Sequence, residues 1–134
     1  MRLLTHNTLR NNSENAKGKG FPLKITATEI RVDKPSLDAN PATQIQFCQG
    51  ILGMLDWSAL VVAASEMGLT TLPPILTSEL AENDAFLQAL YHILMNVHLI
   101  NGMLTCPTTG REFPVTNGIP NMVLDEEECE NVRV

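Results

Sequence analysis

The apolar residues of this chain change their spacing twice, and these changes constrain the fold more than any other feature. From Phe21 to Ala27 they recur at every second position, which is typical of a strand with one buried face. Between residues 40 and 97 they recur at helical spacing. Beyond residue 102, short apolar runs return and are separated by turn residues. The sequence therefore predicts strands near both ends of the chain and helices between them.

The strand segments are expected to form one antiparallel sheet. Residues 1–9 are interpreted as a short strand, because Leu3 and Leu4 are apolar positions between polar ones. Near the other end, Asn117-Gly118 separates two apolar runs and predicts a hairpin, since both residues tolerate positive φ. The simplest arrangement is an α+β fold, with a sheet domain from residues 1–37 and 98–126, a helical insertion at 38–97 and a flexible acidic tail at 127–134.

Three helices are expected in the insertion, and the first two have a recognisable start. Asn40 can cap the first helix, with Pro41 at its first helical position. Asp56 can cap the second helix. The third is predicted to run from about Asn83 to Val97 with a wide apolar stripe, so we expect it to be buried against the other two.

The charge of the chain is distributed unevenly, and this excludes one class of function. The net charge is −6, yet residues 1–34 hold seven of the nine Lys and Arg residues, and residues 35–124 hold only Arg111. An acidic chain binds nucleic acid poorly by itself, because affinity for phosphate comes mainly from Lys and Arg. Any contact with RNA is therefore expected to come through a partner.

The sequence contains no signal for a membrane. Its apolar runs fall far short of the roughly 18 residues needed to span a bilayer. The N-terminus becomes polar too early for a secretory signal peptide. We expect an intracellular protein with no membrane partner.

A search for catalytic residues finds no set above background. The three histidines, His6, His92 and His98, are not spaced to share a metal on one face of a helix. The Gly18-Lys19-Gly20 segment precedes a strand rather than a helix, so it does not have the context of a phosphate-binding loop. The sequence therefore favours a protein that is not an enzyme.

The cysteines suggest one structural motif that is incomplete. The segment Cys106-Pro107-Thr108-Thr109-Gly110 has the shape of a zinc knuckle, but Thr109 occupies the second ligand position and is a poor zinc ligand. The favoured interpretation is a tight turn with a half-buried thiol. A small thiol enzyme that uses Cys106 is an alternative, and it would require a lowered thiol pKa.

Many apolar side chains lie near the two ends of the chain, and a small sheet cannot cover all of them. Either the helical insertion covers these side chains or another protein does. They are Leu3, Leu4, Phe113, Ile119, Met122, Val123 and Leu124.

Three segments of the chain together resemble one protein family. They are Met1-Arg2-Leu3-Leu4-Thr5-His6-Asn7, then Gly20-Phe21-Pro22-Leu23, and finally the block from Cys106-Pro107 through Gly118-Ile119-Pro120-Asn121-Met122. The family is that of the eukaryotic multifunctional methyltransferase subunit. The resemblance implies a zinc-ribbon-like sheet with a helical insertion, in a non-catalytic subunit that activates and stabilises methyltransferases.

The resemblance also implies partners and cofactors. Members of the family form heterodimers with several class I Rossmann-like methyltransferases, which compete for them and modify tRNA, ribosomal RNA and a translation release factor. This implies a location in cytoplasm and nucleus, with S-adenosylmethionine bound by the partner. Some members bind zinc through four cysteines, of which this chain keeps only Cys106, so no zinc or other cofactor is expected here.

Partner binding is expected through strand addition, in which an exposed edge strand pairs with the edge of the methyltransferase sheet. For each apolar residue assigned to this surface, the alternative is a place in the chain's own core. The alternative function is a free-standing ribbon-like adaptor in ribosome assembly or translation. By resemblance, the partner-binding residues are Leu3, Thr5, Asn7, Phe113, Pro114, Ile119, Pro120, Asn121, Met122 and Val123.

Overall fold

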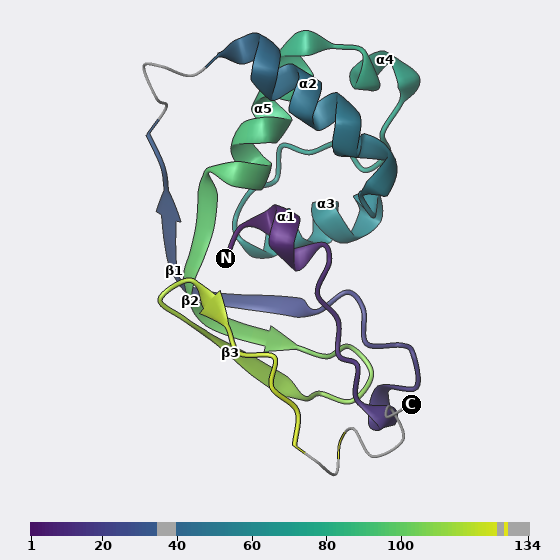
Figure 1. The fold of residues 1–134 in the computed structure, drawn as a ribbon, viewed down its shortest axis with the longest axis vertical. Coiled ribbons are helices and arrows are strands. Elements are labelled where there is room, and N and C mark those ends of the chain that lie inside the picture. The colour runs from purple at the N-terminus through teal and green to yellow at the C-terminus, as the bar shows by residue number, and fades with distance from the viewer. Residues whose placement is uncertain (35–39, 126–127, 129–134) are drawn as a thin grey trace.

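A four-stranded antiparallel sheet at one end and a group of helices at the other make up the molecule (Figure 1). This computed structural model describes residues 1–34, 40–125 and 128. The predicted α+β class is confirmed. In chain order the elements are α1 (Leu3–His6), η1 (Glu14–Ala16), β1 (Lys24–Val32), α2 (Pro41–Ile51), η2 (Leu52–Met54), α3 (Trp57–Glu66), α4 (Ser78–Ala81), α5 (Asp84–Met95), β2 (Val97–Thr105), β3 (Glu112–Thr116) and β4 (Ile119–Pro120).

The sheet has the strand order β1-β2-β3-β4 and joins segments from both ends of the chain. The long strands β1 and β2 pair from Lys24 with Thr105 to Val32 with Val97. β3 and β4 form the predicted hairpin, with Asn117 at φ 50° and Gly118 at φ 80° in its turn. The expectation of one antiparallel sheet built from the two ends is therefore confirmed.

The N-terminal segment differs from its prediction. Residues 1–9 do not form the predicted strand. Leu3–His6 forms the single-turn helix α1, and Arg2 makes an isolated bridge to His98. Leu3 and His6 are three residues apart and are both buried, so a helical turn places them on the same side, toward the core. An extended strand would have pointed them to opposite faces.

The first two predicted helices begin at their predicted caps, and the structure adds a third cap at Asn83. The side chain of Asn40 accepts hydrogen bonds from the backbone at the start of α2, Asp56 does so for α3, and Asn83 does so for α5. α5 ends at Met95 rather than at Val97, which pairs with β1 instead. Within the described ranges, no single helix is long and apolar enough to cross a membrane. One pair of helices, 41–54 and 57–66, is long and apolar enough when taken together, and the two are bent by 114° at the break between them.

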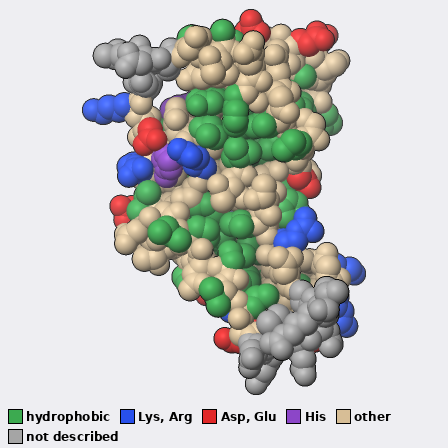
Figure 2. All heavy atoms as spheres, viewed as in Figure 1, with side chains coloured by type: hydrophobic (Ala, Val, Ile, Leu, Met, Phe, Trp, Pro, Cys, Tyr) green, Lys and Arg blue, Asp and Glu red, His purple; other side chains and the backbone are tan. Residues whose placement is uncertain are grey.

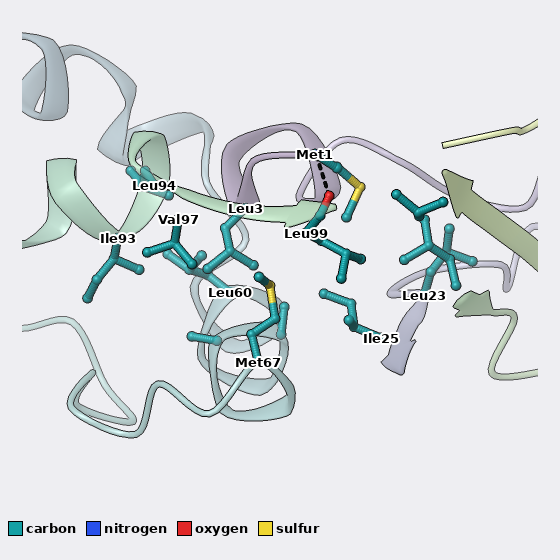
Figure 3. Close-up of a cluster of buried hydrophobic side chains, with 14 of the residues drawn as sticks. Met1, Leu3, Leu23, Ile25, Leu60, Met67, Ile93, Leu94, Val97 and Leu99 are labelled. Carbon is teal, nitrogen blue, oxygen red and sulfur yellow. Dashed lines mark hydrogen bonds between the residues drawn. The ribbon is translucent and has the colours of Figure 1, made fainter. Parts of the chain in front are cut away.

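One hydrophobic core connects the helices to the sheet (Figure 3). Met1, which precedes α1, is tied to the sheet by two hydrogen bonds. Its amino group donates to the carbonyl of Leu99 on β2 at 2.7 Å, and the Leu99 N–H donates to the Met1 carbonyl at 2.8 Å. The chain terminus is thus fixed between the two parts of the molecule. The labelled core residues are Met1, Leu3, Leu23, Ile25, Leu60, Met67, Ile93, Leu94, Val97 and Leu99.

Candidate partner-docking surface

The outer edge of the sheet at β4 carries an extended segment, residues 119–124, with two different faces. Ile119 is 69% exposed and Val123 is 75% exposed. The intervening Met122 is only partly buried and packs against the core. The N–H of Asn121 donates to the Pro114 carbonyl at 2.9 Å, so the pairing with β3 continues past the end of β4. We call residues 119–124 the docking segment.

The docking segment is an open sheet edge, although Pro120 has no N–H to donate to a partner strand. Among the described residues, no strand lies on the outer side of β4. Two of its three exposed alternate positions, Ile119 and Val123, are apolar, and a partner strand with its own apolar side chains can cover them. Figure 2 shows apolar side chains at the surface of the sheet end of the molecule as well as over the helices.

The opposite edge of the sheet, at β1, is obstructed. The outward-facing N–H of Ile25 donates to the Glu66 carboxylate of α3 at 3.1 Å, which removes one of the groups that a partner strand would need. The pairing of β1 with β2 is also irregular between Ala27 and Ile30. Bulges and blocked backbone groups are how proteins protect edge strands from pairing. The β4 edge is therefore the better candidate for docking.

Of the ten residues assigned to partner contact, three are buried in the chain itself. Leu3 and Phe113 are 0% exposed and Asn7 is 8% exposed. For Leu3 and Phe113 the structure replaces the assignment with a place in the core, since β3 points Phe113 inward and its neighbour Pro114 outward. Those that keep an exposed or partly exposed side chain are Thr5, Pro114, Ile119, Pro120, Asn121, Met122 and Val123.

The N-terminus and the β3–β4 turn lie next to each other. Gly118 has φ +80°, and a Cβ added there would lie 3.4 Å from the amino nitrogen of Met1. The Gly118 N–H also donates to Ile100 of β2 at 2.8 Å. A glycine therefore suits this position for its backbone conformation and for the close approach of the N-terminus. The N-terminus therefore lies beside the turn that joins β3 and β4.

Sequence reasoning did not identify Glu66 as a residue that shapes this surface. Its carboxylate lies 41 residues from its partner Ile25 in the chain, and only the packing of α3 against β1 brings them together. The sequence gives no signal for such a contact, because a glutamate near the end of a helix is ordinarily solvated.

The incomplete zinc knuckle is connected by hydrogen bonds. Cys106 Sγ accepts the Thr109 N–H at 3.5 Å, and Thr109 Oγ1 accepts from Asn11 Nδ2 at 3.3 Å. Thr108 Oγ1 donates to the Lys19 carbonyl at 2.6 Å, so two bonds join this turn to the loop that precedes β1. One thiol, one hydroxyl and one amide do not make a zinc site, which needs thiolate or imidazole ligands. The residues present do not fit the metal.

The Cys106 thiol has an altered pKa that follows from the same turn. Burial raises the pKa of this thiol, but hydrogen bonds from Thr109, Asn11 and Thr108 together outweigh burial and lower it to about 7. The side chain is only 2% exposed, so a substrate has no access to the sulfur. The lowered pKa is thus explained by donors that hold the turn together, and this does not favour the thiol-enzyme alternative.

The chain is similar in sequence to known proteins along nearly its whole length. No protein-family model matches the chain. It is 38% identical to the mouse multifunctional methyltransferase subunit TRM112-like protein, over 97% of this chain and 99% of that protein. It is 43% identical to homolog A of TRM112 from Arabidopsis thaliana, over 96% and 99%, and 30% identical to TRM112 of Saccharomyces cerevisiae, over 92% and 96%.

A solved structure is similar as well. It is the Mtq2-Trm112 complex of E. cuniculi, described as responsible for methylation of the translation termination factor eRF1. The TM-score is 0.52 at 14% identity, with 92% of this chain and 95% of that chain covered, and this likeness supports the fold. The sequence identities extend over nearly the whole length of each relative. The chain therefore belongs to the family of the multifunctional methyltransferase subunit TRM112.

Proposed function

We propose that this chain is the small, non-catalytic subunit of heterodimers with class I methyltransferases that use S-adenosylmethionine, and that it activates and stabilises them. Membership of a family named for this role supports the proposal. The observation that carries it is the docking segment, which presents Ile119 and Val123 on an open sheet edge while the other edge is obstructed by Glu66.

The proposed mechanism is strand addition at residues 119–124. Backbone groups of the docking segment that are not already hydrogen-bonded within the chain, as both groups of Val123 are, pair with the edge of the methyltransferase sheet, and the exposed apolar side chains are buried between the two proteins. Full burial of one such side chain is worth about 1.5–3 kcal/mol. Because the subunit binds only the folded enzyme, it shifts the methyltransferase toward its folded state by mass action.

The first experiment is affinity purification of the tagged chain from its own cells, with mass spectrometry of stoichiometric partners. We expect several class I methyltransferases in mutually exclusive complexes, and their substrates to include tRNA, ribosomal RNA and a release factor. RNA is expected to contact the enzyme rather than this acidic subunit. Recovery of ribosomal proteins alone, or of the chain by itself, would favour the adaptor alternative and contradict the proposal.

Matched variants test which edge is used. Ile119→Asp and Val123→Asp place a charge on the docking segment, whereas Ile30→Asp and Val32→Asp place one on exposed positions of β1. We expect the first pair to lose the methyltransferases and the second pair to keep them, with all four variants folded. Loss of partners only in the β1 variants would show that the methyltransferase binds at the β1 edge instead.

We also propose that the chain carries no cofactor of its own and that S-adenosylmethionine is bound by the partner. The donor set of the knuckle, with Cys106, Thr109 and Asn11 engaged with one another, supports a metal-free link between the two loops. Equilibrium dialysis with labelled S-adenosylmethionine would detect binding to the heterodimer and none to the subunit.

A further inference from the structure

Arg111 is the single Lys or Arg between residues 35 and 124, and it lies immediately before β3. Its Nε donates to Glu128 Oε2 at 2.9 Å, and its Nη2 donates to Glu128 Oε1 at 3.2 Å. The guanidinium thus holds the carboxylate with two hydrogen bonds, the geometry that arginine provides and lysine does not. Both side chains are partly shielded, at 32% and 16% exposed.

The same guanidinium reaches the docking segment. Nη2 also donates to the carbonyl of Val123 at 3.3 Å, and Nη1 donates to the carbonyl of Glu112 at 2.6 Å. The group lies over the ring of Phe113, 4.8 Å from its centroid. Since Phe113 is fully buried and belongs to β3, the stacked guanidinium is anchored to a rigid part of the sheet.

Glu128 closes the chain back on itself after the docking segment. Its Oε1 accepts the backbone N–H of Asp125 at 3.0 Å, and its own N–H donates to the Asp125 carbonyl at 2.9 Å. The hydrogen bond from Arg111 is the main reason that the pKa of Glu128 lies below its ordinary value. The Arg111 side chain, immediately before β3, therefore fastens both Val123 and the turn that follows it.

We propose that Arg111 and Glu128 form a clasp that holds the docking segment extended before the partner arrives, which makes Arg111 a positioning residue for methyltransferase binding. The inference rests on the proposed function. β4 is paired over Ile119 and Pro120, and the one further bond to β3, from the Asn121 N–H to the Pro114 carbonyl, lies before Val123, so the clasp acts on the part of the segment beyond that bond. A segment that is already ordered loses less conformational freedom on binding, and its affinity is correspondingly higher.

The test measures the dissociation constant between the purified chain and a methyltransferase recovered with it. We compare Arg111→Gln, Glu128→Gln and the double variant with wild type. Each single variant is expected to weaken binding by about tenfold, and the double variant by no more than either single one, because both changes open the same clasp. Arg111→Lys is expected to behave like Arg111→Gln, because it keeps the charge without the two-bond geometry.

Arg10→Gln is the matched control. Arg10 also lies over a phenylalanine ring, Phe21 at 5.4 Å, but it is remote in sequence from the docking segment. Binding by this variant is expected to equal that of wild type. Amide hydrogen exchange supplies a second readout: in the unbound Arg111→Gln chain, exchange is expected to accelerate in residues 119–124 while β1 and β2 stay protected.

The outcomes separate the two ideas. If wild type captures no methyltransferase, the proposed function fails. If wild type binds and the Arg111 and Glu128 variants bind equally well, the clasp is disproved. If exchange accelerates across the whole sheet, or if the two single variants weaken binding additively, Arg111 has a general structural or direct contact role, and the clasp is again disproved.

Discussion

Asn7 and Asp56 exchange two hydrogen bonds across 49 residues of chain. Asn7 Nδ2 donates to the Asp56 carbonyl at 3.0 Å, and the Asp56 N–H donates to Asn7 Oδ1 at 3.0 Å. The Asp56 side chain meanwhile caps α3 by accepting from the Ala59 N–H. Asn7 therefore fastens the end of α1 to the first turn of α3, and these bonds engage both ends of its amide within the chain.

This pairing leads to the first prediction. Asn7→Ala removes both bonds and leaves two partly buried backbone groups without them, so we expect a loss of about 1–3 kcal/mol in the free energy of unfolding. Thr5→Ala is the control, because Thr5 is exposed on the same helix. Urea denaturation monitored by circular dichroism measures the change. A stable Asn7→Ala chain that fails to bind methyltransferase would instead return Asn7 to the docking surface.

Phe113 and Pro114 are neighbours with opposite roles. Phe113 is fully buried, whereas Pro114 points outward on β3. Phe113→Ala is expected to lower the free energy of unfolding by about 3–5 kcal/mol through loss of core packing. Pro114→Ala is expected to cost no more than about 1 kcal/mol, because it removes only the restriction that a proline places on the unfolded chain. Thermal unfolding of both variants tests this, and equal stability would show that Phe113 packs against a partner instead.

The features that the sequence predicts correctly are those fixed by local chemistry. Asn40 and Asp56 each cap a helix with their own side chains, so their effect does not depend on distant residues. The Asn117-Gly118 turn is equally local, because two residues with positive φ suffice to reverse the chain. Such signals give the element order and the α+β class.

What the sequence does not predict depends on contacts between distant segments. In a segment as short as α1, the apolar positions fit either a strand or a helical turn. Only the helical turn places both Leu3 and His6 on the buried side. The alternation in β3 predicts two faces but not which one is buried. The Arg111–Glu128 ion pair and the hydrogen bond by which Glu66 occupies the Ile25 N–H arise only from tertiary packing.

His6 predicts a specific loss of stability in mild acid. Its Nε2 donates to the Leu23 carbonyl at 2.7 Å, and its buried Nδ1 has no hydrogen-bond partner in the structure. Burial lowers the pKa of His6 below 6.5, although the bond to Leu23 opposes this. The folded state therefore favours the neutral ring, and its stability is expected to decline as the pH falls below 6.5 toward the lower folded-state pKa.

The control for this effect is His6→Gln, in which the side-chain amide can still donate to Leu23 but does not titrate. Other groups contribute to acid unfolding in both proteins, so the informative quantity is the difference in the pH dependence of unfolding free energy. Wild type is expected to lose more stability than His6→Gln between neutral and mildly acidic pH. Parallel pH profiles would show that His6 is protonated without cost in the folded chain.

The link between the two loops at Cys106 gives the last prediction, which concerns zinc. The purified chain is expected to contain no stoichiometric zinc by elemental analysis, and a chelator is expected to leave its melting temperature unchanged, since the donors present do not suit the metal. Thr109→Val removes the acceptor of two hydrogen bonds, from Asn11 Nδ2 and from the Arg111 N–H, and is expected to cost about 1–2 kcal/mol of unfolding free energy. Thr116→Val, at an exposed position of β3, is the matched control and is expected to cost less. One zinc per chain, together with unfolding by the chelator, would show that the loops are joined by metal rather than by these hydrogen bonds.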